Sequence, residues 1–497
     1  MTPSSLPTTR PAPFHLHAEA VEALTGGQWH GGARHAVIHG ATLDSRAVAP
    51  GSLFVCIRGE RVDGHDFAAG AVGDGAALVL ASRPLHLPVP VLVVADAARA
   101  LGQLAAEFRD RCARWTGGGP RWIAVCGANG KTTTKELLAA ACAGTGQVVH
   151  ATRGNLNNHL GVPLTVLATP ADAAWCVIEI GTNAPGEVAA LAPCAKPQVA
   201  VVTSIGPEHL EGFGDLAGVA REECSIFASL PADGTAFVGL HGAVGHGADA
   251  AQLANIARAA AGSRTLHLLD DVDTPTGVAD VPVHGQAGEL SLRLDTFDGS
   301  TEIALLGAHN LANVALAFHA VVAAGVAPQA ALAGLSRALP VAGRLVPRPA
   351  GAHLVLDDTY NANPASMIAG LRVLANCPGR HLAILGPMGE LGAAVAEGHR
   401  VVGAEARRLG LPLLVVAGRG ALAGLEQHLI AGYGAAAQLV ADRPTALAAA
   451  QRLLTAGSTT VLVKASRSQG LEQVVTGLCA ATPSSSSAPS AGADQPC

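Results

Sequence analysis

Charged residues are scarce in this chain of 497 residues: they make up 14%, whereas hydrophobic residues make up 49%. So much apolar material can build several hydrophobic cores, which excludes global disorder. A basic excess is also lacking, because 32 Lys and Arg stand against 38 Asp and Glu, for a formal net charge of −6. This balance argues against a nucleic-acid binder, although a local basic cleft could still hold a small anion.

The ten cysteines lack any metal-binding or redox spacing. No two of them form a Cys-x-x-Cys pair, and none belongs to a Cys/His cluster with zinc spacing. Cys126 and Cys176 lie instead inside apolar runs, as small buried thiols do. We therefore expect reduced, structural cysteines, as is usual in the cytoplasm.

Long uninterrupted apolar runs are absent, since no stretch reaches the about 18 residues of a membrane span. The nearest run, residues 312–327, is interrupted by Asn313 and His319, and a core helix explains it better. The first 13 residues, MTPSSLPTTRPAP, contain no apolar segment of the signal-peptide type. The sequence thus predicts a cytoplasmic protein that does not insert into a membrane.

Breaks in composition predict three domains. The glycine-rich seam at residues 116–120 and the end of a helical pattern near residues 339–343 divide the chain into pieces of ordinary domain size. We predict domains at residues 14–117, 120–338 and 339–480. Residues 1–13 and 481–497 are rich in Pro, Ser and Thr and are predicted to be disordered tails.

Short apolar runs alternate with Ala-rich helical stretches, which predicts an α/β fold with doubly wound layers. The predicted parallel strands are residues 122–126, 175–180, 199–204, 353–357, 381–385, 413–417 and 460–464. Residues 265–305 differ, because Gly and Asp turns and an alternating stretch at 289–294 predict antiparallel ribbons there.

A phosphate-binding loop follows the first of these strands. The strand runs into Gly-Ala-Asn-Gly-Lys-Thr-Thr-Thr and then into a good helix start. Glycines let backbone N–H groups approach phosphates, and the helix N-terminus adds positive potential. We expect Lys131 on the β- and γ-phosphates and the Thr132 hydroxyl on Mg²⁺. The predicted nucleotide-binding residues of this loop are Gly127, Asn129, Gly130, Lys131, Thr132 and Thr133.

The loop is shorter than the ordinary Walker pattern, because Val125 stands where that pattern has its first glycine. A G-x-x-G-K-T loop followed by a Thr run resembles that of the Mur ligase and folylpolyglutamate synthase superfamily. The resemblance extends from about residue 40 to about residue 475. It implies acyl-phosphate chemistry and a three-domain fold. The implied parts are a small N-terminal UDP-binding α/β domain, a central P-loop ATPase domain with a mostly parallel sheet, and a C-terminal Rossmann-like domain.

Three motifs of the central domain resemble family motifs. Residues 154–163, G-N-L-N-N-H-L-G-V-P, imply substrate contacts by Asn155, Asn157 and Asn158. Glu179 lies at the carboxyl end of a predicted strand, where open α/β sheets bind ligands, and the family places a metal-binding glutamate there. The block H-L-E-G-F-G implies that His209 helps to bind a second magnesium ion.

Further motifs imply contacts with the nucleotide and the substrates. In G-A-H-N-L-A-N, Asn310 and Asn313 lie three apart on one helical face, which meets the nucleotide base in the family. The resemblance also implies that Arg344 reaches the ATP phosphates and that Asp358, in D-D-T-Y-N-A-N-P, lies at the nucleotide. Five residues are implied at the other substrates: Ser45 and Arg46 at the uridine diphosphate, and Lys464, Ser466 and Arg467 near an incoming dipeptide.

Two positions depart from the family pattern. The family carries a carbamylated lysine shortly after H-L-E-G-F-G, and Glu223 occupies that position here, unless a one-residue shift places Glu222 there. We hypothesise that Glu223 serves as a direct or water-bridged Mg²⁺ ligand in its place. The second departure is Pro387, which replaces the aspartate of the usual L-G-D-M, and we assign it no role.

The resemblance implies an ATP- and Mg²⁺-dependent ligase that joins D-alanyl-D-alanine to UDP-N-acetylmuramoyl-tripeptide, acting as a monomer. Its implied catalytic residues are Lys131, Glu179, His209 and Arg344. Charge neutralisation and positioning would carry the catalysis, and no Ser/His/Asp or Cys/His nucleophile is signalled. Two alternatives remain: a sister ligase that adds a single amino acid, and a nucleotide-binding protein that has lost catalysis. The sequence also leaves open whether the tripeptide ends in diaminopimelate or lysine.

Overall fold

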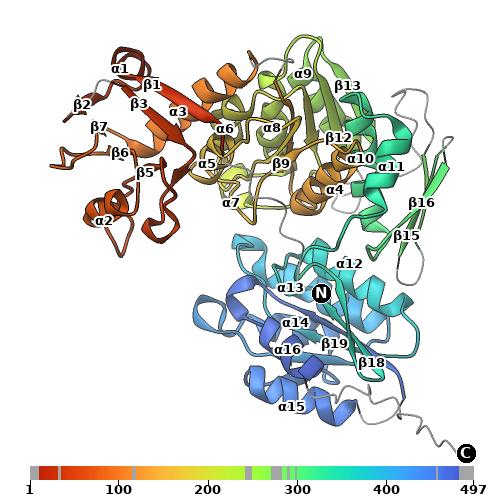
Figure 1. Ribbon diagram of the computed structural model, residues 1–497. Coiled ribbons are helices and arrows are strands. Elements are labelled where there is room, and N and C mark those ends of the chain that lie inside the picture. The colour runs from red at the N-terminus through yellow and green to blue at the C-terminus, as the bar shows by residue number, and fades with distance from the viewer. Residues whose placement is uncertain are drawn as a thin grey trace, which may run out of the picture. The chain divides into compact units, whose positions relative to one another are not determined.

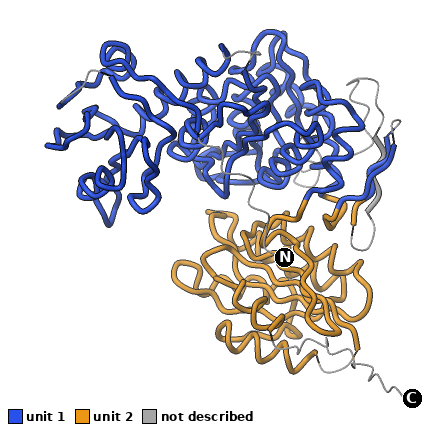
Figure 2. The backbone as a smooth tube through the Cα atoms, in the orientation of Figure 1, with its two compact units in different colours: residues 1–286, 293–303, 310–338 blue, residues 287–292, 304–309, 339–497 orange. Residues whose placement is uncertain are grey.

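The computed structural model describes residues 11–31, 35–114, 119–240, 249–269, 283–287, 291–296, 299–454 and 457–480. The chain divides into two compact units (Figure 2). Unit 1 comprises residues 1–286, 293–303 and 310–338, and unit 2 comprises residues 287–292, 304–309 and 339–497. Most of the predicted seam at residues 116–120 lies outside the described residues, so the boundary between the first two predicted domains stays a prediction.

The N-terminal part of unit 1 is built on a five-stranded sheet with the order β2-β7-β6-β5-β4. Its strands are β2 (Gln28–His30), β4 (Ala41–Thr42), β5 (Leu53–Val55), β6 (Leu78–Ala81) and β7 (Val91–Val93). All neighbours are parallel except β2 and β7. A two-stranded antiparallel ribbon of β1 (Pro13–His17) and β3 (His35–His39) and the helices α1 (Ala18–Thr25), α2 (Ala68–Gly73) and α3 (Ala97–Cys112) complete this part.

The prediction of a disordered tail through residue 13 is wrong for residues 11–13. The Ala12 N–H donates to the Thr169 carbonyl oxygen at 2.9 Å, and Ala12 is buried. Pro13 begins β1, which pairs with β3. Ala12 and the alternate residues Phe14 and Leu16 are apolar and fill the core, a pattern hidden among prolines in the sequence. Residues 1–10 and 481–497 lie outside the described residues.

The central sheet of unit 1 has six parallel strands in the order β13-β12-β11-β8-β10-β9. They are β8 (Arg121–Cys126), β9 (Val149–Ala151), β10 (Trp175–Glu179), β11 (Val199–Val202), β12 (Thr235–Gly239) and β13 (Thr265–Leu269). The three strands predicted here are confirmed. Strand β13 corrects the prediction of antiparallel ribbons from residue 265, because α9 (Ala250–Ala261) returns the chain so that β13 runs parallel to β12.

Helices cover the central sheet (Figure 1). On one side, Trp122, Ala124 and Cys126 of β8 share a buried core with α3, α5 (Gly161–Leu167), α6 (Glu187–Ala195) and α8 (Leu216–Cys224). Helix α4 (Lys131–Ala143) packs against β8, β9 and β10, and also against α11 (Pro328–Leu335). The helices α4 and α11 approach so closely that a Cβ on Gly334 would lie 2.1 Å from the Ala140 carbonyl oxygen.

Unit 1 also contains α7 (Leu210–Phe213), nearly all of α10 (His309–Ala323) and most of a three-stranded sheet, of which only the last residue of β14 and the first residue of β15 are grouped with unit 2. That sheet contains β14 (Val283–Ala287), β15 (Leu292–Thr296) and β16 (Gly299–Ile303). Helix α10 confirms that the apolar run near residues 312–327 is a core helix, since its residues are buried from Asn310 to Val321. No helix in the described residues is long and apolar enough to cross a membrane.

His319 in α10 is expected to make unit 1 sensitive to acid. Burial lowers its pKa from 6.5 to about 4, so the unfolded chain binds a proton more readily than the folded one between these values. Stability should be full above pH 6.5 and fall as the pH drops toward 4, by about 2 kcal/mol between pH 7 and pH 5. Urea unfolding of the protein and of His319→Gln at both pH values measures this loss. An equal pH dependence in the two proteins would contradict it, and His86→Gln on the surface serves as the control.

Unit 2 is a doubly wound α/β layer with the strand order β17-β18-β22-β19-β20-β21. The strands are β17 (Val346–Ala350), β18 (His353–Asp357), β19 (Arg380–Leu385), β20 (Leu413–Val416), β21 (Gln438–Val440) and β22 (Thr459–Lys464). Only the β17–β18 pair is antiparallel. The four strands predicted in this part are confirmed.

Helices lie on both faces of the sheet of unit 2. They are α12 (Pro364–Asn376), α13 (Val395–Arg408), α14 (Glu426–Tyr433), α15 (Arg443–Leu453) and α16 (Glu472–Ala480). Leu462 of β22 faces a core with α12 and α13, whereas its neighbours Val461 and Val463 face a second core with α15 and α16. Burial on both faces is why these strands are continuous apolar runs in the sequence.

The nine cysteines in the described residues form no disulfide, and all but Cys479 are buried. Burial raises the pKa of the Cys56 and Cys112 thiols to about 12, which keeps them protonated and unreactive. The expectation of structural thiols is confirmed for these residues.

Candidate active site

The predicted phosphate loop joins β8 to α4, and two of its glycines are required by close contacts. Gly127 has φ +119°, and a Cβ there would lie 2.4 Å from Thr203 Oγ1. Gly130 has φ +84°, and a Cβ there would lie 2.5 Å from Asn313 Oδ1. Thr203 Oγ1 donates to the Asn129 carbonyl oxygen at 2.6 Å, which ties the loop to the end of β11. A loop this tightly held keeps its shape before a phosphate arrives.

Lys131 starts α4 and turns back over the loop. Its Nζ donates to the Gly127 carbonyl oxygen at 2.5 Å and lies 3.5 Å from Glu208 Oε2. Burial alone would lower the pKa of Lys131, but the carboxylates of Glu208, Glu223 and Glu179 outweigh it and raise this pKa. Lys131 is therefore a positive charge held beside this loop, and its contact with the β- and γ-phosphates stays a prediction.

Glu179 is the last residue of β10, and its carboxylate accepts hydrogen bonds from two other predicted site residues. Its Oε1 accepts from Thr132 Oγ1 at 3.1 Å and from Asn157 Nδ2 at 2.8 Å. Its backbone N–H donates to Thr152 Oγ1 at 2.9 Å, which fixes the strand end. Because β10 is the parallel neighbour of β8, Glu179 and the loop lie at the same edge of the sheet.

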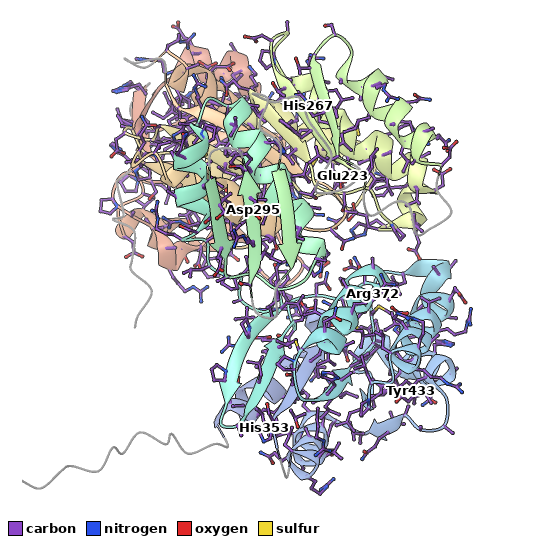
Figure 3. The ribbon with its side chains drawn as sticks, turned by 90° about the vertical axis from the view of Figure 1, so that its right-hand side faces the viewer. Glu223, His267, Asp295, His353, Arg372 and Tyr433 are labelled. Atoms are coloured by element: carbon purple, nitrogen blue, oxygen red, sulfur yellow. The ribbon has the colours of Figure 1, made fainter. Side chains whose placement is uncertain are left out.

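The two glutamates proposed for the carbamylated-lysine position have different contacts in the structure. Glu222 faces α6: Oε1 accepts from the Val188 N–H at 2.8 Å, and Oε2 accepts from the Gly186 N–H at 2.7 Å. Glu223 (labelled in Figure 3) points to the phosphate loop, where its Oε2 accepts from the Gly127 N–H at 2.7 Å. Of the two glutamates, Glu223 is therefore the one that contacts the phosphate loop, and its place at the carbamylated-lysine position stays a prediction.

Glu208 is a site residue that the sequence reasoning quoted within a motif but did not assign. It lies in the loop after β11, beside Lys131, and its carboxylate acts on Glu223. Burial first and Glu208 second raise the pKa of Glu223 well above its usual range, while Lys131 acts in the opposite direction. The signal that could have found it is its place one residue before His209, at the end of a parallel strand.

Three buried carboxylate oxygens around Lys131 have no hydrogen-bond partner in the described residues: Glu179 Oε2, Glu208 Oε1 and Glu223 Oε1. Oxygen donors of this kind, with the Thr132 hydroxyl, suit Mg²⁺. The described residues contain no group of three His, Cys, Asp or Glu that could hold a metal ion by itself. An ion bound by these oxygens would need water and ATP phosphates to complete its shell, which is how Mg²⁺ usually binds nucleotides.

His209 is the predicted site residue with the most unusual backbone. Its φ is +44°, and it immediately precedes α7. Its ring lies 6.3 Å from that of Phe213 in an edge arrangement. No contact of His209 with Glu179 is present in the described residues, so its assignment to a second magnesium ion stays a prediction.

The predicted asparagines have separate surroundings. Asn313 Nδ2 donates to Asn310 Oδ1 at 2.8 Å, and Thr134 Oγ1 donates to Asn313 Oδ1 at 3.3 Å, which places this α10 pair beside the phosphate loop. Asn158 Oδ1 accepts from the N–H of Gly161, the first residue of α5, at 2.9 Å. Asn155 is exposed. Among the three asparagines of residues 154–163, Asn157 is thus the one joined to the acidic site.

Arg46 is engaged by its own neighbour in the N-terminal part. Its Nε and Nη2 donate to the two carboxylate oxygens of Asp44, at 2.9 and 2.7 Å. This hydrogen-bonded pair lowers the pKa of the exposed Asp44 to about 2. Ser45 begins the short helix Ser45–Ala47 beside it. A diphosphate would have to displace Asp44 from the Arg46 guanidinium, so its binding there stays a prediction.

In unit 2, two predicted residues from different motifs form one buried ion pair. Lys464 Nζ lies 2.8 Å from Asp358 Oδ2, and both side chains are about nine-tenths buried or more. Lys464 Nζ also donates to the Asn361 carbonyl oxygen at 2.9 Å. The pair follows from the sheet, because β18 and β22 are parallel neighbours. Arg344 and Arg467 both lie against the ring of Tyr360 at the same edge.

The loop with Pro387 is held without any need for an N–H at that position. The N–H of Gly389 donates to Ser466 Oγ at 2.8 Å, and that of Met388 donates to His399 Nε2 at 2.9 Å. Burial lowers the pKa of His399, which keeps it neutral and able to accept. The Pro387 carbonyl oxygen accepts from the Ser466 N–H at 3.2 Å. Pro387 is therefore compatible with an ordered loop.

Comparison with known proteins shows which family has this sequence and fold. The chain matches the Mur ligase middle domain over residues 125–321, the catalytic domain of the Mur ligase family over residues 37–109, and the Mur ligase glutamate ligase domain over residues 343–467. It is 37% identical over 442 residues to the UDP-N-acetylmuramoyl-tripeptide–D-alanyl-D-alanine ligase of Escherichia coli (strain K12). That match covers 88% of this chain and 93% of the relative.

Two solved structures show the same architecture. MurF from Acinetobacter baumannii superimposes with a TM-score of 0.81 and 30% sequence identity, covering 96% of this chain and 100% of that one. The MurF ligase of Thermotoga maritima, in complex with ADP, gives a TM-score of 0.74 and 25% identity over 88% of this chain and 97% of that one. The α/β fold with three successive domains predicted from the sequence is confirmed by these matches.

Proposed function

Because this chain belongs to the Mur ligase family, we propose that it joins D-alanyl-D-alanine to UDP-N-acetylmuramoyl-tripeptide, in the cytoplasm and with ATP. The proposal depends most on one hydrogen bond. The hydroxyl of Thr132, at the start of the helix after the phosphate loop, donates to the Glu179 carboxylate at the end of the neighbouring strand. A nucleotide phosphate, Lys131 and a cation can meet there. Three relatives named as UDP-N-acetylmuramoyl-tripeptide–D-alanyl-D-alanine ligases, each matched over 93% of its length, support the choice of substrates.

The proposed reaction has two steps, and the site residues act mainly by neutralising the charge of the phosphate groups. The tripeptide carboxylate attacks the γ-phosphorus of ATP, ADP leaves, and an acyl-phosphate forms. Lys131 holds the transferring phosphoryl group, whose charge it neutralises, and Gly127 to Gly130 give it a fixed cradle. Mg²⁺, when bound by Thr132, Glu179 and Glu223, supplies further neutralisation of the phosphate oxygens. The dipeptide amine then attacks the acyl carbon, and inorganic phosphate leaves.

The test is phosphate release by the purified protein with ATP and Mg²⁺. We expect release only when UDP-N-acetylmuramoyl-tripeptide and D-alanyl-D-alanine are both present, and the two tripeptides ending in diaminopimelate or lysine should be compared. Release with a single amino acid instead of the dipeptide would assign the chain to a sister ligase. Binding of ATP without any release would show a nucleotide binder that has lost catalysis.

A further inference from the structure

The sheet of unit 2 brings three separate segments to one edge. Val346, at the start of β17, pairs with Asp357, at the end of β18, because these strands are antiparallel. Asp357 also pairs with Val463, near the end of the parallel strand β22. Arg344 lies two residues before β17, Tyr360 three residues after β18, and Arg467 three residues after β22. These side chains therefore leave the sheet at neighbouring points.

At this edge, two guanidinium groups lie against one aromatic ring. The Arg344 Cζ is 4.4 Å from the centroid of the Tyr360 ring, and the Arg467 Cζ is 5.3 Å from it. The two guanidinium carbons are consequently no more than about 10 Å apart. Two like charges at this distance repel, whereas the negative face of an aromatic ring attracts each of them. The Tyr360 ring is therefore a contact that both arginines share.

The backbone on both sides of Tyr360 is fixed by one lysine. The buried Lys464 Nζ lies 2.8 Å from Asp358 Oδ2 and donates to the Asn361 carbonyl oxygen at 2.9 Å. The Tyr360 N–H donates to the Gly343 carbonyl oxygen at 2.9 Å, next to Arg344. Gly343 has φ +72°, and a Cβ there would lie 3.0 Å from the Tyr360 nitrogen. The ring thus stands on a rigid support, whereas Arg467 is exposed and would otherwise be free to turn.

We propose that Tyr360 is a positioning residue that holds Arg344 and Arg467 as one anion-binding pair. This inference rests on the proposed function and on the sequence-based expectation that Arg344 reaches the ATP phosphates and that Arg467 lies near the incoming dipeptide. Holding both cations on one ring sets the distance between the two anions that they receive. The ring acts through its face, so its hydroxyl is not required.

The test compares Tyr360→Leu with the matched control Tyr360→Phe. Loss of the ring should raise KM for both ATP and D-alanyl-D-alanine by about three- to fivefold, while Tyr360→Phe should stay within about twofold of the parent. Equal defects in the two variants would show that the hydroxyl matters and would overturn the proposal. A rise in only one KM would overturn the pairing. A lower melting temperature with both KM values unchanged would reduce Tyr360 to a structural role.

A readout without substrates separates this proposal from the proposed function. In ¹⁵N-arginine-labelled protein, the Nε–H signals of Arg344 and Arg467, assigned from Arg344→Lys and Arg467→Lys, should both shift in Tyr360→Leu and stay in Tyr360→Phe. If the parent shows no dipeptide-dependent turnover but these shifts occur, the function fails and the ring-held pair stands. If neither signal shifts in Tyr360→Leu, the pair is refuted whatever the enzyme's activity.

Discussion

Replacing Lys131 by methionine is expected to lower turnover by at least about a thousandfold, because the fixed positive charge on the transferring phosphoryl group is lost. Methionine keeps most of the length of the side chain but cannot donate to the Gly127 carbonyl oxygen. It also leaves the carboxylate of Glu208 without the ammonium that lies 3.5 Å away. The measurement is phosphate release at saturating tripeptide and dipeptide.

A matched control is Lys196→Met, which removes a lysine of the same unit that pairs with Asp110 on the surface. It should retain the parent rate, since surface ion pairs contribute little. Circular dichroism of both variants shows whether the fold persists. Turnover within tenfold of the parent in a folded Lys131→Met protein would remove Lys131 from the catalytic residues.

Replacing Glu223 by glutamine is expected to lower turnover by about a hundredfold and to raise the Mg²⁺ concentration needed for half-maximal rate. The amide oxygen can still accept from the Gly127 N–H, which Glu223 Oε2 now accepts at 2.7 Å, so the loop keeps its support. Glutamine cannot ionise, whereas Glu223, despite its raised pKa, can lose its proton when a divalent cation binds and then help Glu179 to neutralise that cation. Rates measured over a Mg²⁺ titration separate the fall in turnover from the higher Mg²⁺ requirement.

Glu222→Gln is the control, because Glu222 is the adjacent buried carboxylate and accepts from Gly186 and Val188 instead of the loop. It should cost stability by weakening the cap of α6 and leave the Mg²⁺ requirement unchanged. Should Glu223→Ala keep both Mg²⁺ affinity and turnover, the idea that Glu223 replaces a carbamylated lysine would fail.

Local patterns predicted much of the fold. The apolar runs that became β8, β10, β11, β18, β19, β20 and β22 were readable because strands buried on both faces are continuously apolar. Residues 11–13 and β13 were misjudged for opposite reasons. Prolines near the N-terminus hid an edge strand. Strand β13 pairs in parallel with a distant strand, and its pairing is not visible in its own residues.

In the candidate site, too, local features could be predicted and contacts between distant segments could not. The loop, Lys131, Thr132 and Glu179 could be predicted because glycine spacing and strand ends are properties of a few consecutive residues. The choice of Glu223 over Glu222 could not, since it depends on which carboxylate reaches Gly127, 96 positions earlier in the chain. Likewise, Asp358 and Lys464 were assigned to different ligands, yet they form one buried pair.

The sequence by itself determined the α/β class, the phosphate loop and the family motifs, because each depends on local periodicity, backbone freedom at glycine or a short run of side chains. Only the tertiary structure decided which carboxylate faces the loop, that Glu208 lies beside Lys131, and that two arginines contact the Tyr360 ring. These features arise where strand order brings distant segment ends to one edge of a sheet. Strand order is set by the packing of whole layers, which no short stretch of residues encodes.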